Sequence, residues 1–162
     1  MAADIIIAPP RLRDIPALHR LFRRALLVDF QYFPLGYVDE ISHQNNLWRL
    51  AAARFRRGRI MVVAKRGDQL IGYALGSLTP EGGGELYWLY VERGERQHRI
   101  GSQLLHTAVR LMCSRGATLV TLVTYDLKDY YLHQGFSYRG KQHIHGVDLD
   151  VMEYRLDGQD KG

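Results

Sequence analysis

The turn that spans residues 91–101 has the residue types and the spacing of an anion-binding site. It reads Val-Glu-Arg-Gly-Glu-Arg-Gln-His-Arg-Ile-Gly and joins an apolar segment to an amphipathic one. Where a helix begins, its first backbone N–H groups lack intrahelical partners and point outward at the positive end of the helix dipole. A turn of this kind can therefore hold a pyrophosphate.

The two segments beside this turn predict the strand and the helix that such a site requires. Residues 85–91 read Glu-Leu-Tyr-Trp-Leu-Tyr-Val, which is almost wholly apolar and aromatic, as in a buried central strand. After the turn, apolar residues recur at helical spacing, and Gly116 stands where the helix should end. The apolar stripe consists of Ile100, Leu104, Leu105, Ala108, Leu111 and Met112.

A second segment of interest, residues 130–136, reads Tyr-Tyr-Leu-His-Gln-Gly-Phe and follows a β-branched run at residues 117–123. The run predicts another strand, and the segment predicts a short helix that Gly135 ends. Asp126 or Asp129 is expected to cap this helix.

Both segments resemble elements of the Gcn5-related N-acetyltransferases (GNAT). The turn is similar to the acetyl-CoA-binding motif of that family, Arg/Gln-x-x-Gly-x-Gly/Ala, which Arg96 and Gly101 match. Residues 131–136 are similar to its Tyr-x-x-x-Gly-Phe element. Arg99 departs from the pattern, because the family usually has its first glycine there. Its guanidinium either pairs with the diphosphate or crowds it, and we expect the pairing.

The remaining segments predict the order β-α-α-β-β-β-α-β-α-β-β, which is the order of the resembled family. They are a strand at 5–8, a helix from 15, a helix at 39–57, a hairpin at 59–65 and 69–79, and strands at 136–143 and 148–156. With 46% hydrophobic residues, the chain can bury one proper core. We therefore expect a single domain over residues 1–162 with an α/β GNAT fold. Its mixed central β-sheet would have about seven strands, a splayed central strand and about four flanking helices.

The resemblance implies acetyl-CoA as the co-substrate, bound in the V-shaped opening where the central strand splays from its neighbour. Backbone groups of Leu89 and Val91 would then bond to the pantetheine arm. The pyrophosphate-binding residues implied in the same way are Arg96, Gln97, His98, Arg99, Ile100, Gly101 and Ser102. A solvent-facing hydroxyl is an equal alternative for Ser102.

The resemblance also implies direct transfer of the acetyl group to a primary amine. An aliphatic ammonium has a pKa of about 10.4, so a base must remove a proton before the amine can attack. Glu85, at the place of the glutamate base in the histone-acetylating members, or a water molecule is the expected base. Tyr131, four residues before Gly135, is the expected acid for the CoA thiolate, and Tyr130 should face elsewhere. The alternatives are a solvated strand end for Glu85 and a packed core tyrosine for Tyr131.

The aromatic residues Tyr32, Phe33 and Tyr37 would form a wall of the acceptor pocket in the frame of this family. Packing between helices explains them equally well. The expected acceptor is a small-molecule or peptide amine. Residues 1–60 contain ten arginines and five acidic residues, and this surplus of +5 would attract a negatively charged acceptor or partner. A solvated helix face is the plainer explanation.

The composition argues for a cytoplasmic protein with no membrane contact. The chain lacks a signal-peptide pattern and any run of about 18 apolar residues, and its one cysteine, Cys113, cannot form an intrachain disulfide. His143 and His145 lack a third ligand at matching spacing, so no metal is expected. A homodimer would be in keeping with the resembled family.

Two other functions compete with that of an acetyltransferase. The first is a non-catalytic acyl-CoA-binding domain, which Arg99 at the usual glycine position motivates. The second, which is less favoured, is a basic nucleic-acid-binding module, which the arginine surplus motivates.

Overall fold

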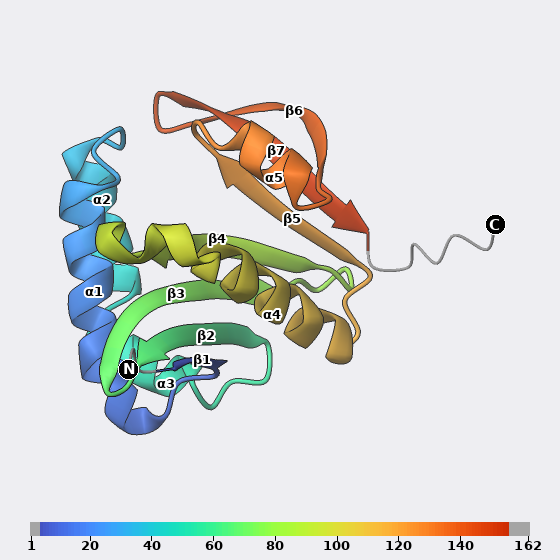
Figure 1. Ribbon diagram of the computed structural model, residues 1–162. Helices are drawn as coiled ribbons and strands as arrows, with labels where there is room; N and C mark the ends of the chain where they lie inside the picture. The colour runs from blue at the N-terminus through green and yellow to red at the C-terminus, as the bar shows by residue number, and fades with distance from the viewer. Residues whose placement is uncertain (1–3, 156–162) are drawn as a thin grey trace.

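The computed structural model describes residues 4–155, where seven strands form one mixed sheet with helices on both faces (Figure 1). The strand order is β1-β2-β3-β4-β5-β7-β6. The strands are β1 (Ile5–Ala8), β2 (Arg59–Arg66), β3 (Gln69–Leu78), β4 (Gly84–Val91), β5 (Leu119–Thr124), β6 (Ser137–Ile144) and β7 (Val147–Arg155). The helices are α1 (Ile15–Val28), α2 (Leu35–Gln44), α3 (Leu47–Ala53), α4 (Ile100–Ser114) and α5 (Lys128–His133), with 3-10 turns η1 (Leu12–Asp14) and η2 (Arg93–His98).

The splayed central strand expected from the sequence is confirmed. β4 and β5 are parallel and pair only at their first residues, where Gly84 lies opposite Val120 and Glu85 lies opposite Thr121. Beyond Glu85 the two strands diverge, as Figure 1 shows, while β4 stays paired with β3 along its length. The sheet therefore contains a V-shaped opening whose closed end is at Glu85.

A β-bulge bends β4 beside this closed end. In the β3–β4 register, Gly76 lies opposite Leu86 and Leu75 lies opposite Trp88, so Tyr87 is an extra residue. Bulges of this kind kink a strand and increase its twist. The strands approach so closely here that a Cβ added to Gly76 would lie 2.4 Å from the carbonyl oxygen of Glu85. The geometry of the opening therefore requires glycine at position 76.

Each face of the sheet carries a hydrophobic core of its own. The apolar stripe of α4 covers one face, where Leu104, Leu105 and Met112 are fully buried. Helices α1, α2 and α3 cover the other face, where Phe22 packs against Tyr73 of β3 with ring centroids 5.7 Å apart. The opening in the sheet therefore connects two separately packed layers.

The helix predicted for residues 39–57 is wrong in its extent, because the chain forms two helices there. The side-chain oxygen of Asn46 accepts a hydrogen bond of 2.9 Å from the backbone N–H of Arg49 and so starts α3 anew. The side chain of Asn45 donates to the carbonyl of Ile41 at the end of α2. The described residues therefore contain five α-helices where about four were expected.

The caps expected for the tyrosine-bearing helix α5 are also wrong. Leu127 is its N-terminal cap residue, and neither Asp126 nor Asp129 supplies a capping hydrogen bond. Thr124, at the end of β5, accepts a hydrogen bond from the backbone N–H of Leu127 instead. The predicted ends of α4 and α5 are confirmed, since Gly116 and Gly135 have the positive φ of 95° and 93° that glycine adopts freely.

Candidate active site

A cavity of about 1050 Å³ occupies the opening between β4 and β5 and extends onto both faces of the sheet. It brings together most of the residues that the sequence singled out, although they lie far apart along the chain. Those that line it are Tyr32, Phe33, Tyr37, Glu85, Leu89, Val91, Arg96, Arg99, Gly101, Ser102 and Tyr131. Ile100 has a buried side chain, so it can offer a ligand only its backbone N–H. His98 is exposed, and the side chain of Gln97 lies outside the described part.

The backbone at Arg99 is left-handed, with φ of 56° and ψ of 23°. Arg99 is the N-terminal cap residue of α4, and glycine is the residue that takes this conformation without a steric cost. The left-handed backbone explains why the family pattern has glycine at this position. Arg99 keeps the same backbone conformation. Its side chain is exposed and lines the cavity.

The start of α4 faces α5 across a short polar contact. The hydroxyl groups of Ser102 and Tyr130 lie 3.3 Å apart, and a Cβ added to Gly101 would lie 3.3 Å from the Tyr130 oxygen. Tyr130 thus lines the cavity at the anion-binding turn, although the sequence suggested that it faces elsewhere. The turn presents the free N–H groups of a helix start together with a hydroxyl and a guanidinium, and these donors suit a diphosphate.

Arg96, the first residue of the motif, makes its contacts within the protein. Its Nε donates to the carbonyl of Val91 at 2.9 Å, and its guanidinium lies 5.5 Å from the centre of the Tyr90 ring. It also lies 3.5 Å from a carboxylate oxygen of Asp29. In this structure Arg96 therefore fixes the turn onto the end of β4, and the carbonyl of Val91 is already bonded.

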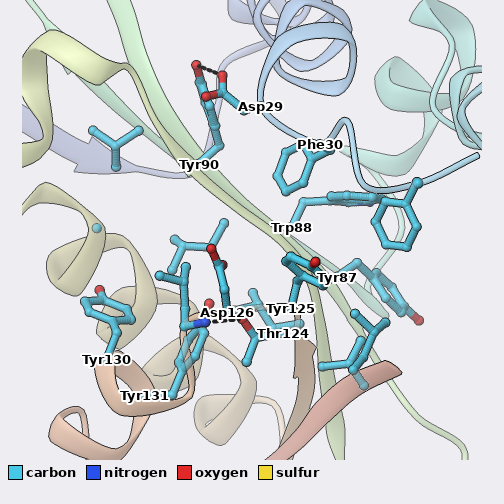
Figure 2. A pocket seen from close by; sticks show the side chains of 18 of the residues that line it. Asp29, Phe30, Tyr87, Trp88, Tyr90, Thr124, Tyr125, Asp126, Tyr130 and Tyr131 are labelled. Carbon is cyan, nitrogen blue, oxygen red and sulfur yellow. Dashed lines mark hydrogen bonds between the residues drawn. The ribbon is translucent and has the colours of Figure 1, made fainter. Parts of the chain in front are cut away.

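Asp29, which the sequence did not single out, ties the end of α1 to this turn. Its carboxylate accepts a hydrogen bond from the Tyr90 hydroxyl at 2.9 Å (Figure 2). It also accepts one from Arg93 Nε at 3.0 Å. Burial raises the pKa of Asp29, but these hydrogen bonds and the charges of Arg93 and Arg96 outweigh burial, so the pKa is lowered. The carboxylate is ionised and its charge is matched by two arginines.

Glu85 lies at the closed end of the opening on the face that α1, α2 and α3 cover. Its partner across β3 is Ser77, which shares a face with Leu75 and Tyr73 beneath α1. Arg59 of β2 lies opposite Ser77, so the three polar residues form a row across three strands. Glu85 is half-buried and lines the cavity.

Tyr131 is a residue of α5. It reaches the same cavity from the opposite layer of the sheet, the one that contains α4. Its side chain is only 6% exposed, and its ring packs against Phe136 with centroids 5.6 Å apart. Burial raises the pKa of the Tyr131 hydroxyl, with further contributions from Tyr130 and Tyr32. This hydroxyl has no hydrogen-bond partner among the described residues, so it remains a protonated donor that can reach a ligand.

The aromatic residues predicted for the acceptor wall lie together. The rings of Tyr32 and Phe33 are 4.6 Å apart, and those of Phe33 and Tyr37 are 4.8 Å apart. Tyr32 also stacks on Tyr125 beyond β5, at 4.4 Å and an interplanar angle of 9°. Sequence reasoning missed Tyr125, because only the folded chain brings the connection after β5 against the one after α1.

Other lining residues that the sequence did not single out for the acceptor site come from β4 and the β5–α5 connection. In Figure 2, Tyr125 and Asp126 lie between the tyrosines of α5 and Trp88 on β4. Trp88 packs edge-on against Phe30, with ring centroids 5.2 Å apart. The dense aromatic run of β4 was the available signal for Trp88, but it predicted only a buried strand.

The chain belongs to the acetyltransferase (GNAT) family, whose model matches residues 16–136. The fold is similar to that of PaiA N-acetyltransferase from Thermoplasma acidophilum in complex with coenzyme A, at 20% identity and a TM-score of 0.78. That match covers 94% of this chain and 99% of the other. No curated protein sequence matches this chain.

Two further structures have the same fold. One is YncA from Salmonella typhimurium, a putative acetyltransferase with its cofactor acetyl-CoA, at 16% identity and a TM-score of 0.71, covering 96% of this chain and 95% of that one. The other is ribosomal-protein-alanine N-acetyltransferase from Brucella melitensis, at 24% identity and a TM-score of 0.70, covering 93% and 99%. Acetyl-CoA is the co-substrate of this family.

Residues 4–155 contain neither a candidate membrane-spanning helix nor a candidate metal cluster. None of the helices there combines the length and the apolar character that a membrane span requires. Within the same range, no three His, Cys, Asp or Glu side chains come together as a metal site would need.

Proposed function

We propose that this chain transfers an acetyl group from acetyl-CoA directly to a primary amine. The observation that carries the proposal is the position of Glu85 and Tyr131, which line one cavity from opposite layers of the sheet. An amine that approaches from the Glu85 side and a thioester held on the Tyr131 side would meet in the gap between β4 and β5. This arrangement suits transfer in a single step between two bound substrates.

The donors at the start of α4 support the placement of CoA. The free N–H groups of its first turn, the Ser102 hydroxyl and the Arg99 guanidinium surround the part of the cavity next to Tyr130. The diphosphate would lie there. The pantetheine arm would run along the unpaired edge of β4 past Leu89 toward Glu85.

Glu85, directly or through a water molecule, takes a proton from the ammonium, and the neutral amine attacks the thioester carbonyl carbon. A C–N bond forms and the C–S bond breaks when the tetrahedral intermediate collapses. Tyr131 donates its hydroxyl hydrogen toward the departing sulfur. The nitrogen loses a second proton, which restores the Tyr131 hydroxyl, and Glu85 releases the first to solvent, so the products are an acetamide, the CoA thiol and one proton.

Kinetics of Glu85→Gln and Tyr131→Phe test these two roles. Each substitution should lower kcat by about 100-fold, the low end of what a positioned acid or base supplies. The Kd for acetyl-CoA should stay within about twofold, because neither side chain belongs to the diphosphate site. Glu81→Gln, an exposed position in the turn before β4, is the matched control. Unchanged turnover in Tyr131→Phe with CoA binding intact would reject its role as acid.

A further inference from the structure

The acceptor side of the cavity is lined mainly by aromatic rings. We refer to Tyr32, Phe33, Tyr37, Tyr87, Trp88 and Tyr125 as the aromatic chamber. They come from three parts of the chain: the α1–α2 region, the bulged part of β4 and the connection after β5. Flat rings on several sides suit an apolar body of about ring size, because they offer contact area with little loss of side-chain freedom.

Two stacked pairs bridge the walls of the chamber and limit its size. Tyr32 and Tyr125 stack at 4.4 Å and join the α1–α2 connection to the β5–α5 connection. Tyr37 of α2 stacks at 4.0 Å on His145, in the turn between β6 and β7. A compact molecule would leave both contacts in place, whereas a long chain that passes between these segments would have to separate them.

The ionic groups of the chamber are few. Glu85 and Asp126 are the carboxylates on the acceptor side that have no ion pair among the described residues. Asp29 also lines the cavity, but Arg93 and Arg96 already match its charge. Arg59 contributes a positive charge in the same row as Glu85.

We propose that the acceptor is a compact monoamine whose single ammonium group is attached through a short chain to one apolar, ring-sized body. This inference rests on the proposed acetyl transfer and specifies its second substrate. The ammonium lies beside Glu85, the carboxylate at the closed end of the opening. The body packs between Tyr32, Tyr125 and their neighbours. Its nitrogen bonds to the acetyl carbon, CoA leaves as the thiol, and one proton passes to solvent.

The same features disfavour more polar acceptors. A polyamine or an aminosugar with several ammonium groups would bring its further charges toward Arg59, with too few free carboxylates to match them. An extended peptide would need to displace the Tyr37–His145 bridge. Specificity therefore comes from the scarcity of charge as well as from the apolar contact.

The test compares kcat/KM for 2-phenylethylamine, ethylamine, spermidine, kanamycin and a peptide with a free alanine N-terminus, at saturating acetyl-CoA. We expect 2-phenylethylamine to exceed each of the others by about tenfold or more, the effect of one well-packed ring. A higher kcat/KM for spermidine, kanamycin or the peptide would overturn this inference and leave acetyl transfer standing. Acetylation of none of these amines would overturn the proposed function and the inference together.

Variants of the aromatic chamber provide a second test of the inference. Tyr125→Ala should raise the KM for 2-phenylethylamine by about tenfold and change the KM for ethylamine by less than about twofold. Tyr125→Leu keeps apolar bulk and replaces the alanine variant if that variant is unstable. Its KM for 2-phenylethylamine should lie between those of the wild type and Tyr125→Ala. Tyr138→Ala, an exposed tyrosine on β6 outside the cavity, is the control. An equal effect of Tyr125→Ala on both amines would contradict a role in recognising the apolar body.

Discussion

At the scale of the residue, Arg99 combines a left-handed backbone with a positive charge at the start of α4. The backbone conformation lowers the stability of the fold, whereas the charge favours binding of the diphosphate. The backbone conformation costs an arginine about 1 to 2 kcal/mol that glycine would not lose. The guanidinium adds a donor to the diphosphate site. The departure from the family pattern is therefore a substitution that keeps the shape of the turn and changes its charge.

Arg99→Gly should stabilise the fold by about 1 kcal/mol and weaken acetyl-CoA binding by about fivefold, the value of one exposed ionic contact. Urea unfolding and titration calorimetry measure the two effects. Arg99→Asn, which tolerates the left-handed conformation without the charge, should weaken binding to a similar extent. Tighter binding in Arg99→Gly would instead mean that the side chain obstructs the cofactor.

The buried hydroxyl of Tyr131 predicts a distinctive pH profile. Burial raises its pKa above the usual value of about 10, so it stays protonated in the range in which the acceptor ammonium titrates. The kcat of the wild type should therefore rise with pH and hold its value up to about pH 10. A descending limb with a midpoint below about 10 that disappears in Tyr131→Phe would contradict this assignment.

At the scale of the element, the opening depends on how closely β3 approaches the bulge in β4. Gly76→Ala would place a Cβ 2.4 Å from the Glu85 carbonyl and 2.9 Å from Met112 Cε, so β4 must move. We expect a loss of about 1 to 3 kcal/mol in the free energy of unfolding, together with a fall in kcat as Glu85 is displaced. The measurements are urea unfolding and steady-state kinetics.

Gly58→Ala is the control for this prediction, because a Cβ there meets no atom within 4 Å. Equal stability and turnover in Gly76→Ala and Gly58→Ala would mean that the close approach of β3 to β4 does not hold the opening in shape.

The elements themselves were predictable where one local rule decides them. The central strand, the stripe of α4 and the glycine that ends it follow from periodicity and from the freedom of glycine at positive φ. The division between α2 and α3 was not predictable from periodicity, because it depends on Asn46 closing a cap. The role of Asp29 depends on arginines more than 60 residues away.

At the scale of the whole molecule, the candidate site spans both layers of the sheet. Glu85 belongs to the layer of α1 to α3, and Tyr131 belongs to the layer of α4 and α5. The two motif segments that identified the family both lie on the side of α4 and α5. The aromatic chamber lies on the other side and comes from three distant segments, so its composition could not be derived from spacing along the chain.

The buried tyrosines of both layers make stability depend on alkaline pH. Burial raises the pKa values of Tyr73 and Tyr131, so above about pH 10 the unfolded chain loses protons that the folded chain retains. Stability is unaffected by these groups below pH 10. Above it, unfolding should become easier by about 3 kcal/mol per pH unit for the pair. Urea unfolding at pH 8, 10 and 10.5 measures the slope.

Tyr73→Phe separates the two contributions. The Tyr73 hydroxyl is buried without a hydrogen-bond partner among the described residues, so its removal should leave stability at pH 8 unchanged or increased. The slope above pH 10 should fall by about 1.4 kcal/mol per pH unit, the contribution of one tyrosine. A slope that Tyr73→Phe leaves unchanged would mean that Tyr73 does not contribute to it.

The most direct test of acetyl transfer is mass spectrometry of a reaction that contains the protein, acetyl-CoA and 2-phenylethylamine, with free thiol measured in parallel. We expect an N-acetylated amine in equal amount to the CoA released, and about 100-fold slower formation of both in Tyr131→Phe. Binding of acetyl-CoA without an acetylated product from this or any other amine of the panel would contradict it.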